Sequence, residues 1–254
     1  RLCRFPAVYD RRSASGDEVR SDSYAVVVMI NISLPDGSVR KFEKPVSGTE
    51  IAASIGPGLA KAALALRVDG KMVDLAHVVD RDATIGIVTS KDPQALELLR
   101  HDAAHVLAQA VQELYPGTQI TFGPSTEDGF YYDFVRAEPF SPEDFAKIEQ
   151  RMAEIVDRNL PIVREVWDRA RIKDHFQRHG ESFKAEWADE LPKDEVISVY
   201  KQGDWLDMCL GPHLPSTSKL GKAFKLTKVS GAYWRGDKNN AQLQRIYGTV
   251  FFTT

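Results

Sequence analysis

The stretch LLRHDAAHVLAQA (residues 98–110) decides the fold of the larger part of this sequence. Apart from a few polar positions it is apolar, which predicts a buried helix. Two histidines, His101 and His105, stand four positions apart in it, and a helix places such positions on the same face. Because buried polar groups need partners, this pair raises the question of which other side chains it meets.

The residues on either side set the bounds of this helix. Asp92 can cap the first turn, Pro93 suits the first helical position, and Tyr115-Pro116-Gly117 ends the helix after Leu114. Helix and strand patterns both follow, so residues 91–240 are predicted to form an α+β domain. Its further elements are expected at 120–135 (strand, turn, strand), 141–159 (helix capped from Ser141), 167–179 (helix ending at Gly180), 195–209 and 223–234 (strands).

The preceding residues are predicted to form a smaller domain. Apolar residues alternate around Pro35-Asp36-Gly37 and around Asp69-Gly70, which indicates two hairpins, at 30–43 and 63–75. A short helix capped by Thr49 and ended by Gly56-Pro57-Gly58 is expected between them, and a closing strand at 83–90. Residues 29–90 therefore have the size of a ubiquitin-like β-grasp module. Their one histidine, His77, is expected at the surface or in packing.

The composition is that of an ordinary globular protein and excludes several classes. Hydrophobic residues make up 43% and charged residues 27% of the 254 residues. The net charge of −3 excludes a uniformly basic nucleic-acid binder, so any RNA contact must come from a local patch. Cys3 and Cys209 are too few for a disulfide framework, and no apolar run approaches the roughly 20 residues of a membrane span. We therefore expect a cytoplasmic protein.

Residues 1–28 differ from the rest of the sequence. Residues 1–23 show no apolar period and combine arginine and serine with four acidic residues, whereas transit peptides are poor in acids. Ordered patterning begins at Met29. We predict that residues 1–28 are a disordered or extraneous leader.

A second cluster supplies partners for the two histidines. The segment DMCLGPH (207–213) places Cys209 and His213 around a Gly-Pro turn. Three imidazoles and one thiol match the ligand set of a tetrahedral zinc site. A zinc protease is not indicated, because Asp102 stands where such enzymes have their glutamate base, and nothing near Cys209 matches a cysteine protease. The alternative is four residues without a joint role.

A second pair with the same spacing, His175 and His179, is predicted to be structural. It lies in a charged segment that ends at Gly180, and cationic side chains are favourable at a helix C-terminus without any further function. No second cysteine is available in this part of the sequence to complete a ligand set. The spacing of two histidines therefore does not define a site by itself.

Seven motifs in one order resemble the N-terminal half of bacterial threonyl-tRNA synthetases. They are LPDGS, IGPGLAKA, RHDAAHVLAQA, GFYYDF, GESFK, DMCLGPH and GAYWRGDKNNAQLQRIYGT. The resemblance covers about residues 29–250. It implies that 29–90 form a TGS domain with a β-grasp fold, that 91–240 form the editing domain shared with alanyl-tRNA synthetases, and that 241–254 begin a linker.

The resemblance implies that the larger domain proofreads threonine tRNA. Serine lacks one methyl group of threonine, and a pocket discriminates such a difference by only about 1–3 kcal/mol, so a second site must hydrolyse the wrong ester. In this hypothesis His101 orients or deprotonates water, Lys184 supplies positive charge near the ester, and Asp207 binds the amino group of serine. The implied editing residues are His101, His105, Lys184, Asp207, Cys209 and His213, with Tyr132 lining the seryl-adenosine pocket.

Two interpretations of the metal question stay open. The spacing favours zinc on His101, His105, Cys209 and His213, the set that alanine-specific relatives use. The closer resemblance, to threonyl enzymes, implies editing without a metal, so we expect no cofactor for editing. ATP and a catalytic zinc would belong to an aminoacylation domain, whose motifs do not occur in this sequence.

A basic segment, residues 219–238, is expected to contact the acceptor end of tRNA(Thr) carrying serine. It has five lysines and one arginine against one aspartate, with Tyr233 and Trp234 between them. Basic groups neutralise phosphates, and aromatic rings stack on unpaired bases. The residues expected to bind tRNA are Lys222, Lys225, Lys228 and Arg235. The alternative is a solvated basic strand.

Taken as it stands, the sequence predicts an aminoacyl-tRNA deacylase that does not charge tRNA. The resemblance further implies that the longer family enzymes form homodimers through a domain not found here. Two alternatives remain: a non-catalytic RNA-binding module and an inert synthetase fragment.

Overall fold

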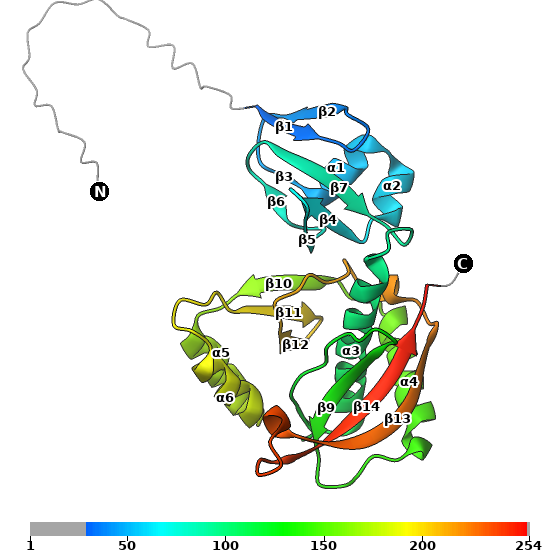
Figure 1. The fold of residues 1–254 in the computed structure, drawn as a ribbon, viewed down its shortest axis with the longest axis vertical. Helices are drawn as coiled ribbons and strands as arrows, with labels where there is room; N and C mark the ends of the chain where they lie inside the picture. Colours follow the sequence, from blue (N-terminus) through cyan, green and yellow to red (C-terminus); the bar gives the residue numbers. More distant parts are fainter. Residues whose placement is uncertain (1–28, 253–254) are drawn as a thin grey trace, which may run out of the picture.

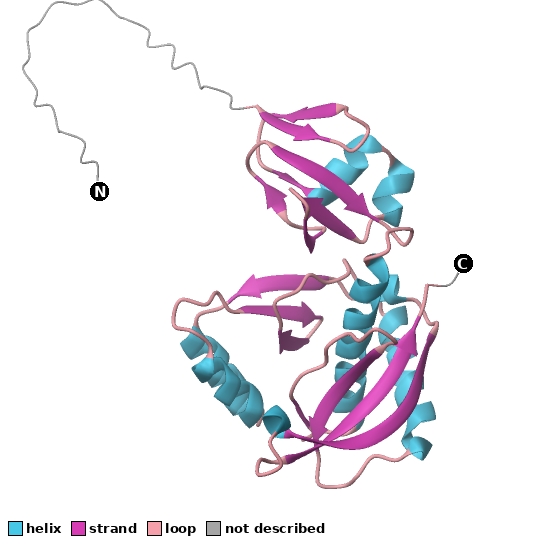
Figure 2. Cartoon of the chain, viewed as in Figure 1, coloured by secondary structure: helices cyan, strands magenta, loops and turns pink. Residues whose placement is uncertain are grey.

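The computed structural model describes residues 29–252, which form two bodies joined at the start of a long helix (Figure 1). The leader predicted at residues 1–28 lies outside the described residues. Among the helices of residues 29–252, none is both long and apolar enough to cross a membrane. The predicted α+β class is confirmed, because a small sheet with helices is followed by a larger body with two further sheets (Figure 2).

The first body is a five-stranded sheet with the order β2-β1-β7-β4-β5. Both predicted hairpins are confirmed, since β1 pairs antiparallel with β2, and β4 with β5. The predicted closing strand, β7, lies in the middle of the sheet, parallel to β1. The elements are β1 (Ile30–Ser33), β2 (Val39–Phe42), β3 (Val46–Ser47), α1 (Gly48–Ile55), α2 (Pro57–Ala62), β4 (Ala65–Val68), β5 (Lys71–Asp74), β6 (Val78–Val79) and β7 (Ala83–Val88).

The predicted cap of the first helix was wrong. Ser47, rather than Thr49, is the N-cap of α1: its hydroxyl accepts a hydrogen bond from Glu50 N–H (3.3 Å), and Glu50 Oε2 accepts one from Ser47 N–H (2.8 Å). This reciprocal pair satisfies N–H groups that the first turn leaves free. Gly56 ends α1 as predicted, but Pro57 begins α2 instead of a loop, because proline suits a first helical position.

The second body is built around α3. Figure 1 shows α3 and α4 behind a four-stranded sheet with the order β13-β14-β9-β8, and a three-stranded sheet, β10-β11-β12, on the other side of α3. The elements are α3 (Ala95–Leu114), β8 (Gln119–Ile120), β9 (Phe130–Val135), η1 (Pro142–Asp144), α4 (Phe145–Asp157), β10 (Ile162–Val166), α5 (Arg169–Arg178), α6 (Ser182–Glu190), β11 (Ser198–Gln202), β12 (Trp205–Met208), η2 (Thr217–Leu220), β13 (Phe224–Tyr233), η3 (Trp234–Gly236) and β14 (Gln242–Val250).

The apolar sequence of α3 is explained by its burial. Side chains around this helix, among them Leu99 and Leu107, are fully buried, as the opening stretch predicted. Leu64, Ala65 and Val88 of the first body belong to the same apolar cluster as α3. The two bodies therefore share a continuous core, and burial of apolar side chains stabilises their junction by about 1.5–3 kcal/mol for each large residue.

Three parts of the second body differ from the prediction. The helix α3 begins at Ala95 rather than Pro93, because Asp92 Oδ1 accepts a hydrogen bond from Gln94 N–H (3.0 Å) in the turn before it. Strand β10 and helix α6 were not predicted. Residues 241–254, expected to begin a linker, contain β14, which pairs with both β13 and β9. Because both of its edges are paired, β14 is an inner strand of the four-stranded sheet, and its residues alternate between buried and half-buried from Ile246 to Val250.

Candidate active site

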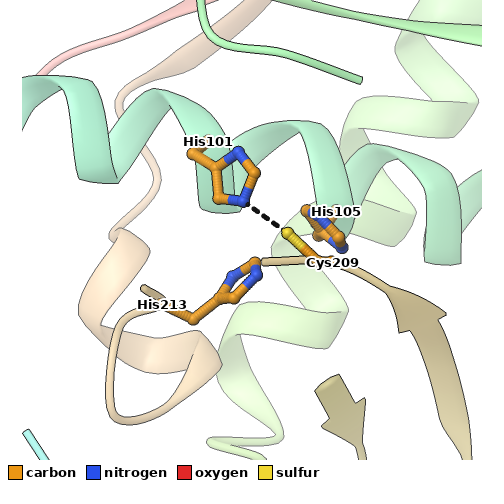
Figure 3. A group of neighbouring side chains, drawn as sticks. All are labelled: His101, His105, Cys209 and His213. Carbon is orange, nitrogen blue, oxygen red and sulfur yellow. Dashed lines mark hydrogen bonds between the residues drawn. The ribbon is translucent and has the colours of Figure 1, made fainter. Parts of the chain in front are cut away.

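The two clusters singled out from the sequence meet in space. Figure 3 shows His101 and His105 projecting from α3 toward Cys209 and His213, which lie on the loop after β12. One ring nitrogen of each histidine and the sulfur of Cys209 all lie within 4.8 Å of one another. His101 Nε2 is 3.1 Å from Cys209 Sγ, although the two residues are 108 positions apart.

The hairpin before the loop fixes the position of Cys209. Its N–H donates a hydrogen bond to Ser198 O (3.1 Å), and the Ser198 hydroxyl donates one to Cys209 O (2.5 Å), which extends the β11–β12 pairing by one step. The loop then turns at Gly211, whose φ is +71°. A Cβ at this position would lie 1.9 Å from Tyr200 Oη, so only glycine fits here.

Asp102 holds the other end of the loop from α3. It is fully buried, lies 3.1 Å from His213 Nδ1, and accepts a hydrogen bond from Leu214 N–H (3.0 Å). Sequence reasoning considered Asp102 only as a poor replacement for a protease glutamate and missed this role. The signal was present, since an acidic residue next to His101 in an apolar helix needs a partner.

A second polar group lies beside the four residues. Lys184 Nζ, on α6, is 2.6 Å from Asp207 Oδ1, and the two side chains are only 1% and 2% exposed. The Tyr132 hydroxyl donates a hydrogen bond to Asp207 Oδ2 (2.5 Å), and the same oxygen lies 3.6 Å from His105 Nδ1. A buried ion pair contributes little net stability, so its presence next to the histidines favours a functional role.

Burial and mutual contacts shift the pKa values of three side chains. Burial, followed by the charge of His213, lowers the pKa of His105. Burial opposes ionisation of Cys209, but its contacts with the three histidines outweigh this and hold the pKa of the thiol well below its usual range. Burial also lowers the pKa of His213, but Asp102 and Cys209 outweigh it and raise the pKa to about 10. These shifts favour the thiolate form of Cys209, the cationic form of His213 and the neutral form of His105.

The donor atoms of the four residues also fit a zinc ion. His105 Nδ1 and His213 Nε2 are buried and have no hydrogen-bond partner within residues 29–252. Buried polar nitrogens without partners are unusual, and the chemistry of three imidazoles and one thiolate is that of zinc. The contact of Asp102 with the other nitrogen of His213 is the carboxylate–histidine arrangement found around metal ligands.

These groups form the polar end of a cavity of about 450 Å³. His213 is 2% exposed and is not part of the cavity wall. The opposite wall is mainly apolar, which is typical of small-molecule sites. The polar end is formed by His101, His105, Tyr132, Lys184, Asp207 and Cys209, and the apolar wall includes Phe122, Trp187, Leu191, Ile197 and Leu210.

The pair His175 and His179 meets no third ligand among the described residues. Their ring centroids are 4.2 Å apart, and His179 Nδ1 lies 2.7 Å from His175 O at the end of α5. No Cys, Asp or Glu side chain of residues 29–252 joins them in a group that could hold a metal. This arrangement agrees with a structural role.

The four basic residues expected to bind tRNA lie outside the cavity wall. Arg235 is next in sequence to Trp234, whose ring stacks on the cavity residue Phe122 with 5.6 Å between centroids. Carboxylates of the chain itself already pair with three of the four. The contacts are Lys222 with Asp157 (2.6 Å), Lys225 with Glu149 (2.8 Å), Arg235 with Glu186 and Glu190 (2.6 Å each), and Lys228 over the ring of Tyr247 (4.3 Å).

Glu181 is a further buried polar residue that sequence reasoning missed. It directly precedes α6, is 6% exposed, and accepts hydrogen bonds from Ile120 N–H (2.9 Å) and from the side-chain amide of Gln112. Burial raises the pKa of this carboxyl to about 7. The motif GESFK pointed to Lys184, and the glutamate three residues before it links the start of the same helix to β8 and α3.

Comparison with known proteins assigns both bodies to families. Residues 30–89 match the TGS domain, and residues 197–247 match the threonyl and alanyl tRNA synthetase second additional domain. These two matches, in this order, place the chain among aminoacyl-tRNA synthetase sequences.

The relatives narrow this class further. The threonine-tRNA ligase of Rhodospirillum rubrum is 65% identical over 223 residues, which are 88% of this chain and 35% of that protein. The threonine-tRNA ligase of Thiobacillus denitrificans is 63% identical over 224 residues, with the same shares of the two chains. The chain spans about a third of the length of the curated relatives that it matches, and corresponds to the N-terminal part of a threonyl-tRNA synthetase.

Proposed function

We propose that this chain hydrolyses the ester of Ser-tRNA(Thr) and so removes serine wrongly attached to threonine tRNA. The main support is that His101, Lys184 and Asp207 converge on one cavity. Ester hydrolysis needs a group that activates water, a positive charge for the developing oxyanion, and a group that holds the substrate, all within a few ångströms. The threonine-tRNA ligase names of the relatives support threonine tRNA as the partner.

The cavity would act as a second sieve based on size. A site that accepts threonine cannot sterically exclude serine, which is smaller by one methyl group. In the proposed editing cavity the preference between the two amino acids is reversed. The wall that contacts the amino acid would leave room for serine but not for the additional methyl group of threonine. Tyr132 is suited to this, since it is 1% exposed and its hydroxyl is held by Asp207 while its ring meets His105 edge-on at 6.3 Å.

His101 is the proposed general base. Its Nε2 lies 3.1 Å from the Cys209 thiolate, which favours the tautomer with the proton on Nε2. The other ring nitrogen, Nδ1, is then free to take a proton from water. His105 would shape the polar end of the cavity, and His105 and His213 together would hold Cys209 in its ionised form.

The roles of Lys184 and Asp207 are linked. Without substrate, Asp207 is saturated by Lys184, by the Tyr132 hydroxyl and by Met208 N–H (2.7 Å). We infer that the ammonium group of serine takes the place of Lys184 on Asp207. Lys184 then turns toward the ester, where its charge stabilises the oxyanion.

Hydrolysis in this proposal needs no resident metal. His101, His105, Cys209 and His213 would hold a zinc ion if one binds, and a bound zinc ion polarises an ester or activates water. The proton transfer assigned to His101 and the charge supplied by Lys184 do not depend on it.

The acceptor end of the tRNA is proposed to lie along the basic segment 219–238. Phosphates would replace the carboxylates that now pair with Lys222, Lys225 and Arg235. Arg235 and Trp234 would be the members of the segment nearest to the cavity.

Deacylation assays on matched variants test the function. His101→Ala and Lys184→Ala are expected to slow hydrolysis of Ser-tRNA(Thr) by about 100-fold or more, because each removes a group acting in the transition state. His175→Ala, in the other pair with the same spacing, serves as the control and is expected to keep the wild-type rate. Loss of serine no faster than in buffer, or a fully active His101→Ala variant, would refute the proposal.

A further inference from the structure

A carboxylate of the TGS domain reaches the loop of the candidate active site. Asp74 ends β5, the edge strand of the first sheet that faces the second body (Figure 1). Its Oδ1 accepts a hydrogen bond from His213 N–H (2.8 Å), and its Oδ2 accepts one from the Tyr200 hydroxyl (2.8 Å). His213 is 139 positions further along the chain. Both acceptor oxygens of Asp74 are thus used across the junction of the two bodies.

Tyr200 supports the same loop. It is 2% exposed, and its ring packs against the His213 imidazole with 4.1 Å between the centroids. Its hydroxyl lies against Gly211, where a Cβ would be 1.9 Å away. Asp74 therefore holds the main chain of His213 directly, and holds Gly211 through the ring of Tyr200.

His213 is fixed by two carboxylates from two domains. Asp102 on α3 contacts its Nδ1 at 3.1 Å, and Asp74 on β5 accepts from its main-chain N–H. Contacts at both the imidazole and the main chain hold His213 in one position. A contact at only one of them allows the loop to rotate. Cys209, four residues earlier, is held by the β11–β12 hairpin, so the contacts of Asp74 and Asp102 set where His213 lies relative to Cys209.

Apolar and polar contacts also hold the junction of the two bodies. Leu64, Ala65 and Val88 of the TGS domain share the core cluster of α3, which carries His101 and His105. A second polar link joins the bodies, since Arg67 Nη2 lies 3.0 Å from Asp92 Oδ2 just before α3. The contact of Asp74 with the loop is therefore one of several that join the TGS domain to the second body.

We propose that Asp74 is a positioning residue and that the TGS domain thereby completes the candidate active site. Asp74 touches neither the cavity nor the proposed substrate, and it acts through the 209–213 loop. The effect on hydrolysis rests on the proposed function, whereas the effect on the loop does not.

Two substitutions at Asp74 and one control separate positioning from general destabilisation. Asp74→Ala removes both acceptors and leaves His213 N–H and the Tyr200 hydroxyl without them. Asp74→Asn keeps both links, because its carbonyl accepts from His213 N–H while its amide group donates to the Tyr200 oxygen. Asp80→Ala is the control, since Asp80 is an exposed carboxylate of the same domain and has no side-chain hydrogen bond or ion pair within the part of the chain described.

The first readout is independent of activity. Selective ¹⁵N labelling of the six histidines gives a simple amide spectrum of the full chain, in which a His213→Gln variant assigns the His213 signal. We expect Asp74→Ala to shift this signal, because the amide loses its bond to a carboxylate. Asp74→Asn and Asp80→Ala are expected to leave it close to its wild-type position.

The second readout is the split between kcat and KM for Ser-tRNA(Thr). Misplacement of a catalytic group by about 1 Å lowers the rate by about 100-fold, so we expect Asp74→Ala to lower kcat by about 10- to 100-fold with KM little changed. Asp74→Asn is expected to restore most of the rate. A general loss of folded protein would instead lower the fraction of active enzyme. It would do so equally in every variant of the same stability.

Two results would overturn the positioning role. One is a His213 signal and a kcat in Asp74→Ala equal to those in Asp80→Ala. If Asp74→Ala does not fold, Tyr200→Phe replaces it. This variant is expected to move the His213 signal and to lower kcat by a smaller factor. An unchanged signal together with an unchanged kcat in Tyr200→Phe is the second overturning result. If the wild-type chain does not hydrolyse Ser-tRNA(Thr), the proposed function fails, while the amide spectrum still decides the role of Asp74.

Discussion

Replacing Lys184 by methionine tests whether the buried ion pair is a working part of the candidate active site. The change keeps most of the apolar stem of Lys184 and leaves Asp207 buried without its cation, with a side chain 2% exposed. Breaking a buried pair from one side costs about 3–5 kcal/mol. Because Tyr132 and Met208 N–H still donate to Asp207, at 2.5 and 2.7 Å, we expect the lower end, about 3 kcal/mol.

The double variant Lys184→Met/Asp207→Asn supplies the control. The neutral amide removes the unpaired charge, so the two substitutions together are expected to cost less than their sum, by about 1–3 kcal/mol. Urea unfolding followed by circular dichroism measures the free energies of unfolding, with unchanged slopes as the check on comparability. Hydrolysis of Ser-tRNA(Thr) is expected to stay lost in the double variant, because neither proposed charge is restored.

The outcome that refutes this reasoning is additivity. If Lys184→Met lies within about 0.5 kcal/mol of wild type, or if the two single changes sum to the double change within that margin, the pair is not a coupled buried unit. A double variant that regains hydrolysis would show that the charges of Lys184 and Asp207 are not needed for the reaction.

Three further predictions concern stability and metal content. Burial raises the pKa of Glu181 from 4.5 to about 7, so the free energy of unfolding of the wild type falls as the pH rises through this window. Relative to wild type, Glu181→Gln should therefore gain up to about 3 kcal/mol between pH 4 and pH 8 in urea unfolding, and a constant difference would contradict this. Gly211→Ala should cost more than about 2 kcal/mol, because its Cβ meets Tyr200, whereas Gly221→Ala, at a φ of +67° in open space, should cost about 1 kcal/mol; equal losses would contradict this. Elemental analysis should find far less than one zinc per chain, and a chelator should leave hydrolysis unchanged; loss of activity that zinc restores would make the four-residue set a catalytic metal site.

Features set by neighbouring residues could be predicted from the sequence. The hairpins at Asp36-Gly37 and Asp69-Gly70 depend on local turn chemistry, and the cap of Ser141 with Asp144 is confirmed for the same reason. His101 and His105 share a face because helical spacing requires it. The expectation that the two distant clusters act together came from their residue types, because three imidazoles and one thiol match a zinc ligand set, and the family resemblance added to it.

Features that depend on partners far along the chain could not be predicted. The grips of Asp74 and Asp102 on His213 join residues 139 and 111 positions apart, and no local pattern marks them. The basic segment was singled out by its charge, but the carboxylates that pair with it come from α4 and α6. The domain boundary at residue 240 cut through the motif GAYWRGDKNNAQLQRIYGT and therefore left out β14, which pairs with both β13 and β9.

The most direct measurement is the single-turnover hydrolysis of Ser-tRNA(Thr) and Thr-tRNA(Thr) by the wild-type chain under identical conditions. A cavity that admits serine and excludes one additional methyl group should release serine faster by a factor of about 10 to 200. Equal rates for the two esters, or rates no higher than those without protein, would contradict an editing site in this cavity.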